Sequence, residues 1–585
     1  MGQTEADSGN AAGNSHAVIT HGPILGRPGP DSMGVWVRTS EPGDFLVTCK
    51  AETAEFGIAE PGTTSLHHDN TGCVIVRNLK PDTRYSYSVK IPGYAETEIF
   101  GSFSTLPAEN QVRNEQHNPE GLFNFSFEFG CGNYQTPRIY PDTLMPTYAT
   151  MQRRIADKVQ FQVMNGDFIY EAARGTSPSE WGSANNVSKG DLPDILDMTP
   201  GLAGVWANYK LYLDRSQHLR EWHRTVPALF VIDDHEILND IGGTGRPGHR
   251  NKVALFRDVG VRAWRDYVGW SNPYPPENRG EIFISRGSVN EGEPVLTDTG
   301  ADYSGLSLDR ISNLHIHWNG DHPAAGVYEV ERTLDSHRLR IYPAPPASGR
   351  NIVYSLGKLN YYSFRVSNCE FFVLDTRSMR GLHNVDNPWK QGLSMLGERQ
   401  YEWLVQGMQN SDADFFFVVS SVNFTIPHVS PRDPEKDEAW TVFLEERERL
   451  FDLWDDMERP VFLLTGDLHN SFAIQITDNL WEFASGPHSS GNHYAVEEGD
   501  RPPSGPFSYN GRTVDIRWSS YFLDDVPRRY LRKKYYCVVQ VNNVLNNPTE
   551  ERNPRWVAYP EPQVMFRFYD GESGELEYTE SVTGG

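Results

Sequence analysis

The chain has 585 residues, with 53 Lys and Arg against 78 Asp and Glu, so its formal net charge is −25. This charge opposes non-specific binding to nucleic acids and anionic lipid surfaces, because both are polyanions, and we expect no sequence-specific nucleic-acid binding. The 14 Trp, 27 Tyr and 29 Phe exclude a disordered chain. No window holds about 18 consecutive apolar residues, so we predict no membrane span.

The first 16 residues are polar and rich in Gly, Ala and Ser, which predicts a disordered tail over 1–16. They contain neither the basic nor the apolar region of a signal peptide, so the chain as written is expected in the cytoplasm. The five cysteines are far apart and form no CxxC pair. We therefore expect neither a disulfide framework nor a structural zinc site.

Residues 17–106 contain short alternating runs between turns, such as Met33–Thr39 and Tyr85–Val89. This spacing is typical of a β-sandwich. The segment Leu79–Tyr85 resembles the tyrosine corner of fibronectin-type domains, in which the Tyr hydroxyl bonds back to the preceding turn. We therefore predict an N-terminal all-β, fibronectin/Ig-like sandwich over 17–106, followed by a charged linker to about residue 120.

From residue 120 onward, apolar strand-like runs alternate with helical stretches, including Gly204–Trp222 and Lys252–Val268. This alternation predicts an α/β layered domain over 120–585. Short alternating runs around Asn-Gly and Gly turns interrupt it, so we predict an inserted β module at about 277–360. The C-terminal runs flanking Asp570-Gly571 predict a hairpin that completes a sheet.

Candidate metal ligands follow four of the predicted strands, at the edge where open α/β sheets place their sites. Each residue alone has an ordinary explanation, such as a turn Asp, a helix-capping Asp or a buried Cys. Together they are harder to explain, because paired acids repel each other unless a cation offsets their charge. Carboxylates and phenolate favour hard cations, whereas imidazole and thiolate suit borderline or ferric ions. The candidates are Cys131; Asp167 and Tyr170; Asp233, Asp234 and His235; and Asp467 and His469.

As a set, these motifs resemble the PhoD-like alkaline phosphatase/phosphodiesterase family of the calcineurin-like metallophosphoesterase superfamily. The stretches Leu374–Arg380 and Met395–Gln400 and the N-terminal β domain add to the likeness. It covers about residues 18–275 and 360–490. The resemblance implies an αββα metallophosphatase sandwich. The family is usually exported, so the likeness points to a secreted or periplasmic protein if a signal was removed.

The resemblance also implies an Fe3+ and Ca2+ site, with other divalent metals left open. By this likeness Asp167 bridges the two ions, Asp467 and an acid of the Asp233/Asp234 pair complete the second site, and either Asn239 or Asp240 is a further calcium ligand. The implied ferric ligands are Cys131, Asp167, Tyr170 and His469.

The expected activity is metal-dependent hydrolysis of small phosphate monoesters or diesters by in-line attack of a metal-bound hydroxide. His235 is expected to hydrogen-bond a phosphoryl oxygen or to protonate the leaving alkoxide. Arg377, ranked ahead of Arg138 and Arg380, is the candidate for a phosphate fork. Ordinary surface salt bridges are the alternative explanation for these arginines.

Two other functions stay open. One is a non-catalytic adhesion or scaffold protein stabilised by calcium. The other is a glycoside hydrolase that uses an Asp and the Glu of Asp233–Glu236 as its two carboxylates, although this leaves the Cys and Tyr without a role. Several further features have bland interpretations: His315 and His317 as a polar strand face, Tyr209 and Tyr212 as core packing, Asp433–Glu438 as a solvated loop, and Arg528–Lys534 as an exposed charge run.

Overall fold

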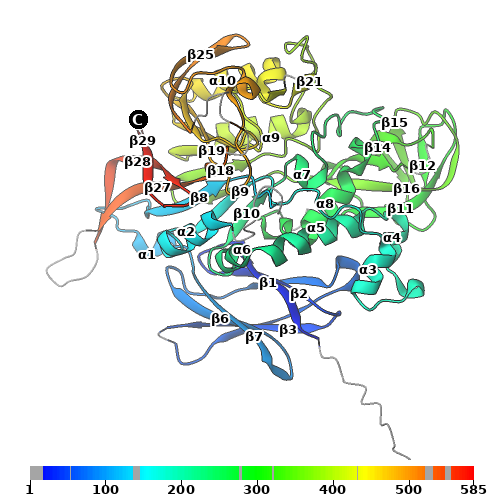
Figure 1. Ribbon diagram of the computed structural model, residues 1–585, viewed down its shortest axis with the longest axis horizontal. Helices are drawn as coiled ribbons and strands as arrows, with labels where there is room; N and C mark the ends of the chain where they lie inside the picture. The colour runs from blue at the N-terminus through cyan, green and yellow to red at the C-terminus, as the bar shows by residue number, and fades with distance from the viewer. Residues whose placement is uncertain are drawn as a thin grey trace, which may run out of the picture.

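The computed structural model describes residues 17–52, 54–135, 145–275, 280–318, 322–430, 432–520, 527, 531–546 and 555–584. Within them the chain forms an N-terminal all-β region, two large mixed sheets with flanking helices, and a small closed barrel (Figure 1). No helix in these ranges has the length and apolar character needed to cross a membrane. The predicted tail, 1–16, lies outside the described residues.

The N-terminal region contains two antiparallel sheets around their own apolar core. Tyr85 is buried there, and its hydroxyl accepts a hydrogen bond from the Lys80 backbone N–H at 2.7 Å, which is the contact expected for a tyrosine corner. One sheet has the order β1-β2-β5, with β1 Ile19–Gly26, β2 Met33–Thr39 and β5 Thr71–Val76. The other has the order β4-β3-β6-β7, with β4 Ile58–Thr63, β3 Asp44–Ala51, β6 Arg84–Ile91 and β7 Tyr94–Ser104.

A six-stranded mixed sheet follows, with the order β10-β9-β8-β27-β28-β29. Its first three strands are parallel, and the C-terminal strands join them antiparallel through β27. The predicted C-terminal hairpin is confirmed, because β28 and β29 pair antiparallel and extend this sheet. The strands are β8 Phe125–Gly130, β9 Phe161–Asn165, β10 Ala228–Val231, β27 Tyr535–Asn546, β28 Trp556–Asp570 and β29 Leu576–Thr583.

The second large sheet has eight strands in the order β17-β18-β19-β22-β24-β23-β26-β25. Its central strands β18, β19, β22 and β24 are parallel, and antiparallel strands extend both edges. The strands are β17 Tyr362–Val366, β18 Cys369–Val373, β19 Phe415–Val419, β22 Val461–Thr465, β23 Phe472–Gln475, β24 Leu480–Ala484, β25 Gly505–Tyr509 and β26 Arg512–Ser519.

The two large sheets meet in an aromatic core. The ring of Phe127 on β8 lies 5.3 Å from that of Phe371 on β18 and 5.4 Å from that of Phe417 on β19, both edge-on. Each such ring contributes about 2–3 kcal/mol by burial, with roughly 1 kcal/mol more from edge-to-face contact. A second core lies on the other side of the eight-stranded sheet, under helices α9 Gly397–Asn410 and α10 Leu444–Asp456.

The helices beside the six-stranded sheet correct one sequence prediction. The chain forms two helices, α5 Leu202–Arg215 and α6 Gln217–His223, where a single helix over Gly204–Trp222 was predicted. Ser216 separates them, because its backbone is extended and its Oγ accepts from Leu219 N at 3.2 Å as the cap of α6. The stretch predicted as helical over Lys252–Val268 forms α8 Arg257–Tyr267 after a short 3-10 turn.

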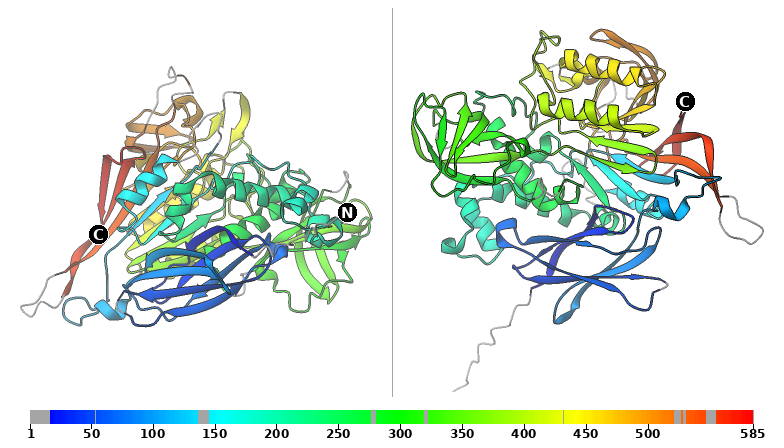
Figure 2. Two further views of the ribbon diagram at one scale, coloured as in Figure 1. Left: turned by 60° about the horizontal axis from the view of Figure 1, so that its bottom comes forward. Right: turned by 180° about the vertical axis from the view of Figure 1, so that it is seen from behind.

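The stretch predicted as an inserted β module contains six strands that close into a barrel, in the order β11-β12-β15-β14-β13-β16. Figure 2 shows it on the side of the molecule opposite the C-terminal strands. His315 on β13 and His317 just after it are buried, and their Nε2 atoms lie 2.9 Å from the carbonyl oxygen of Thr244 and 2.8 Å from Ser355 Oγ, so the predicted polar strand face is a buried one. The strands are β11 Phe283–Val289, β12 Val295–Thr297, β13 Ile311–Ile316, β14 Gly326–Asp335, β15 Arg338–Tyr342 and β16 Gly349–Lys358.

Candidate metal centre

The loops that follow β8, β9, β10 and β22 converge between the two large sheets. Three residues in them have left-handed backbones although they are not glycine: Asp167 (φ 57°), Asp467 (φ 64°) and His469 (φ 54°). Such conformations cost about 1–3 kcal/mol each and persist where the surroundings hold them. The surrounding structure therefore holds these three residues in strained backbone conformations, which direct their side chains into the site.

Tyr170, Asp167 and His469 form the first group of donor atoms. The Tyr170 hydroxyl lies 2.7 Å from Asp167 Oδ2 and 2.8 Å from His469 Nε2, and these last two atoms are 3.2 Å apart. His469 Nδ1 faces the carbonyl of Gly491 at 3.1 Å, so Nδ1 carries the ring hydrogen and Nε2 presents a lone pair. Burial lowers the pKa of His469 to about 3, which keeps the ring neutral. The lone pairs of these three side chains thus converge, and the Ser490 hydroxyl lies 3.0 Å from the phenol oxygen as a further neighbour.

Cys131 lies beside this group. Its side chain is buried, and burial raises the pKa of the thiol well above its usual range. The nearby carboxylates of Asp167, Asp467 and Asp233 raise this pKa further. A thiolate at this position therefore requires a cation among the same carboxylates, as metal coordination provides.

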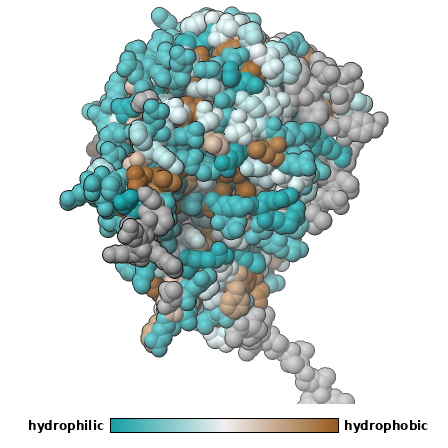
Figure 3. Space-filling view, turned by 90° about the vertical axis from the view of Figure 1, so that its left-hand side faces the viewer, coloured by the Kyte–Doolittle hydropathy of each residue, from teal (hydrophilic) through white to brown (hydrophobic). Residues whose placement is uncertain are grey.

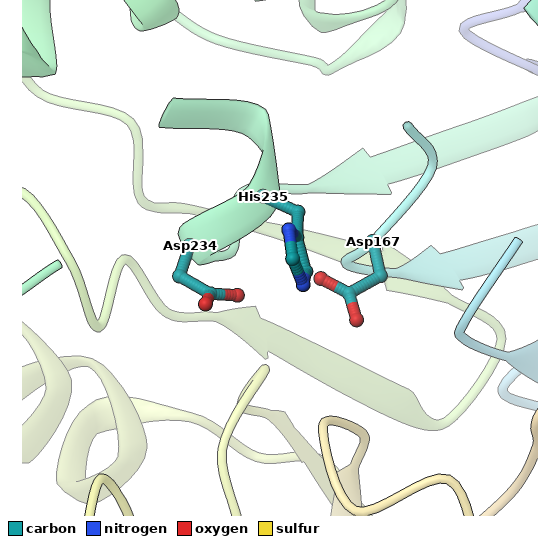
Figure 4. Close-up of side chains that lie close together, drawn as sticks. All are labelled: Asp167, Asp234 and His235. Atoms are coloured by element: carbon teal, nitrogen blue, oxygen red, sulfur yellow. The ribbon is translucent and has the colours of Figure 1, made fainter. Parts of the chain in front are cut away.

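Asp233 and Asp234, with Asp467, form the second group. One carboxylate oxygen from each lies within 4.8 Å of the others. Asp234 also meets the corresponding atoms of Asp167 and His235 within the same limit. Figure 4 shows Asp234 and His235 on helix α7 Asp234–Ile237 pointing toward Asp167, which comes from the loop after β9.

Unpaired oxygens test whether a metal fits. Asp167 Oδ1 and Asp233 Oδ2 are buried and have no hydrogen-bond partner within the described ranges. Burial and neighbouring acids raise the pKa of Asp233 to about 7, although Arg377 acts in the opposite direction. Buried carboxylates are normally paired or bound to metal, because an uncompensated charge is costly. The carboxylate, phenol, imidazole and thiol set therefore fits metal ions.

Two glutamates organise these loops: Glu236, which the sequence analysis considered only for the glycoside-hydrolase alternative, and Glu171, which it did not single out. Glu236 accepts backbone N–H bonds from Asp233 at 2.8 Å and Phe168 at 2.7 Å, so it joins the loops after β9 and β10. Glu171 Oε2 lies 2.8 Å from His235 Nδ1, so it fixes the orientation of that ring. The spacing Asp233-x-x-Glu236 matches a capping box, which was a usable sequence signal.

Arg377 is fully buried, and it contacts carboxylates instead of the cavity. Its Nε donates to Asp233 Oδ1 at 2.6 Å and its Nη1 to Glu438 Oε2 at 2.5 Å. The predicted phosphate fork is therefore corrected, since this guanidinium holds two acids. Arg380 is buried as well, and Arg138 lies outside the described residues.

The acidic run Asp433–Glu438 corrects another prediction. The C-terminal end of this run is buried. One carboxylate oxygen of Glu438 lies within 4.8 Å of a carboxylate oxygen of Asp234 and of Asp240, so the run is not the solvated loop that was predicted. Burial opposes ionisation of Glu438, but Arg377, the hydrogen bond with Asp240 and the charges of His428 and Lys436 together outweigh it and hold the pKa well below its usual range. Of the two alternatives, Asp240 brings its carboxylate to this cluster, whereas Asn239 gives its backbone N–H to Glu171.

A cavity of about 700 Å³ opens onto Tyr170, His235 and His469. Tyr212, predicted as core packing, also lines it, and Tyr209 is buried as predicted. The remaining residues that line this cavity are Tyr134, Gln135, Glu171, Ala172, Arg215, Ser490, Gly491, Asn492, His493 and Leu531.

Figure 3 shows one face of the molecule, on which hydrophobic residues are scattered among hydrophilic ones.

Comparison with known proteins gives one family match over the core of the chain and two similar solved structures. The PhoD-like phosphatase profile matches residues 125–286 and 352–515, and a domain of unknown function (DUF7800) matches 16–98. The solved structure of PhoD is 15% identical, with a TM-score of 0.54 over 95% of this chain and 90% of that one. Purple acid phosphatase PPD1 from yellow lupin (Lupinus luteus) seeds is 10% identical, with a TM-score of 0.46 over 96% and 74%. No curated protein matches the chain in sequence.

The class of protein follows from the profile and the site: this is a metal-dependent phosphoric ester hydrolase. The chain belongs to the PhoD-like phosphatase family, since the profile matches more than half of its length. The profile leaves out residues 287–351, which make up most of the barrel and lie within the stretch predicted as an inserted β module.

Proposed function

We propose that this enzyme hydrolyses phosphate monoesters or diesters at a two-metal site. One ion, proposed as Fe3+, would be held by Cys131, Asp167, Tyr170 and His469. The other, proposed as Ca2+, would be held by Asp167, an acid of the Asp233/Asp234 pair, Asp467 and Asp240. The carrying observation is the pair of buried, unpaired oxygens, Asp167 Oδ1 in the first donor group and Asp233 Oδ2 in the second.

Two ions held there would supply a hydroxide nucleophile near neutral pH and neutralise the developing charge on the phosphoryl group. The chain's own residues orient the reaction. His235 borders the cavity beside Asp167 and Asp234, so it is placed to hydrogen-bond a phosphoryl oxygen or protonate the leaving alkoxide. Glu171 holds the ring in that orientation through Nδ1.

The division of the chain into domains supports the proposed assignment as a two-metal phosphoesterase. We infer a fibronectin-like sandwich over 17–106 and an αββα metallophosphatase domain over 120–585, interrupted by the barrel. The Tyr85 contact supports the first, and the shared aromatic core of the two large sheets supports the second.

The deciding experiment measures metal content by mass spectrometry on protein purified without chelator, together with hydrolysis of p-nitrophenyl phosphate and bis(p-nitrophenyl) phosphate. We expect iron and calcium near one equivalent each, and at least a 10³-fold loss of kcat in Asp167→Asn. The exposed Asp191→Asn serves as the matched control, with unchanged metal and rate.

Three results would contradict the proposal. Wild-type turnover in Asp167→Asn would refute the proposal that Asp167 belongs to the catalytic centre. Calcium binding with no turnover of either ester would favour the scaffold function. Glycoside hydrolysis that survives metal removal would favour the two-carboxylate alternative.

A further inference from the structure

Barrel strand β13 is hydrogen-bonded to a chain segment outside the barrel, Thr244–Gly245. His315 Nε2 lies 2.9 Å from the carbonyl oxygen of Thr244, and Asn313 Nδ2 donates to the carbonyl of Gly245 at 3.1 Å. A carbonyl only accepts, so His315 carries its hydrogen on Nε2. Both side chains are buried, which makes these two bonds costly to leave unmade.

The same segment contacts the Arg377 loop on its other side. The Thr244 hydroxyl donates to the carbonyl of Arg377, and Gly245 N donates to the carbonyl of Arg380 at 3.3 Å. The approach is close, because a Cβ at Gly245 would lie 2.4 Å from backbone atoms of Met379. The segment therefore fills the space between the barrel and this loop.

The Arg377 loop ends at the metal centre. Its guanidinium is shared between Asp233 and Glu438, and Asp233 keeps only Oδ2 free for an ion. A second contact reinforces the loop, since Arg257 Nη1 donates to the carbonyl of Ser378 at 2.7 Å and also to Asn313 Oδ1. A continuous set of buried hydrogen bonds thus joins β13 to Asp233.

We propose that His315 and Asn313 are positioning residues for the metal centre. They hold Thr244–Gly245 against the Arg377 loop, and this keeps the guanidinium on Asp233 and Asp233 Oδ2 facing the ion. The barrel then acts as a support for the second metal site. This inference rests on the proposed function and takes Asp233 as the acid of the Asp233/Asp234 pair that binds the ion.

The test compares His315→Leu, which removes the N–H donor, with His315→Gln, whose amide nitrogen replaces Nε2. The readout is the divalent metal retained by the purified full-length protein as EDTA is raised, measured by mass spectrometry. We expect His315→Leu to lose metal at about tenfold lower EDTA, which is at the low end of the effects seen for partners of metal ligands, and His315→Gln to restore most of the difference.

A stability control separates positioning from general loosening of the barrel. Leu339 is buried in the barrel core on β15, which pairs with β12 and β14. Leu339→Ala should lower Tm yet retain metal as the wild type does, at a temperature where every variant is folded. Equal metal loss in Leu339→Ala and His315→Leu would overturn the proposal.

Two further variants keep the test decisive. Thr244→Val removes the hydroxyl donor at nearly constant volume, so we expect it to weaken metal retention. This variant tests the proposal even if His315→Leu does not fold. Wild-type metal retention in Thr244→Val would overturn the proposal. Asp233→Asn tests the underlying site. Metal retained in Asp233→Asn refutes the assignment of that ligand, whereas metal lost there but kept in His315→Leu and Thr244→Val refutes only the positioning role.

Discussion

The hydroxyl of Tyr170 lies 2.8 Å from Nε2 of His469, although 299 residues separate the two in the chain. Tyr170 follows β9 of the six-stranded sheet and His469 follows β22 of the eight-stranded sheet. Their contact exists only when the two sheets pack through their phenylalanine core. Packing energy therefore sets the geometry of the donor atoms.

Tyr170→Phe tests whether this phenol binds a ferric ion. A phenolate on Fe3+ gives a broad visible absorption band, so we expect the wild-type protein to be coloured and Tyr170→Phe to lose the band. The iron content should be measured in the same samples. Tyr134→Phe is the matched control, because its ring packs edge-on against Tyr170 at 4.8 Å and lines the same cavity. A band that persists unchanged in Tyr170→Phe would exclude this residue as the ligand.

His235→Asn tests the role of the imidazole in leaving-group protonation. Alkyl phosphates need this proton far more than p-nitrophenyl esters, whose leaving group is stable as an anion. We expect kcat to fall about 10²–10⁴-fold on an alkyl phosphate and less than tenfold on the p-nitrophenyl ester. Glu171→Gln should show the same pattern more weakly, because it disturbs only the ring orientation. Equal losses on both substrates would contradict protonation by His235.

Arg377→Met tests whether the arginine holds the acids or the phosphate. Removing it leaves Asp233 and Glu438 buried without their partner, which typically costs about 3–5 kcal/mol. We expect a matching loss in the free energy of unfolding by urea. Inhibition by inorganic phosphate should stay within a few fold of wild type under conditions where the variant is folded and its metal content, checked by mass spectrometry, equals that of wild type. Weak phosphate inhibition with unchanged stability would instead restore the phosphate-fork hypothesis.

The four strand-end motifs were predictable because each is local. A strand, a turn and its polar residues lie within a few positions, and the strand ends of an α/β domain share an edge. The partners of Arg377 were not predictable, because Glu438 lies 61 residues away in a run whose composition indicates a solvated loop. Likewise, the alternating residue pattern placed His315 on a strand, but it gave no sign that the ring would be buried and hydrogen-bonded to the carbonyl of Thr244.

His223 provides a stability test away from the metal centre. It is buried among the rings of Tyr148, Phe168 and Phe230, and neither ring nitrogen has a hydrogen-bond partner in the ranges that the structure describes. Burial lowers its pKa from 6.5 to about 3, with a smaller effect from His488. The native state therefore excludes a proton that the unfolded chain takes up below pH 6.5.

The sign of the pH dependence follows. The contribution of neutral His223 to stability is complete above pH 6.5 and is lost progressively as the pH falls from 6.5 toward 3. Between pH 7 and pH 5 the loss is roughly 2 kcal/mol, from the unfolded-state titration alone. His223→Leu cannot take up this proton, so its unfolding free energy in urea should gain about that amount relative to wild type on going from pH 7 to pH 5. An equal pH response in wild type and His223→Leu would mean that the buried ring is already protonated in the native state.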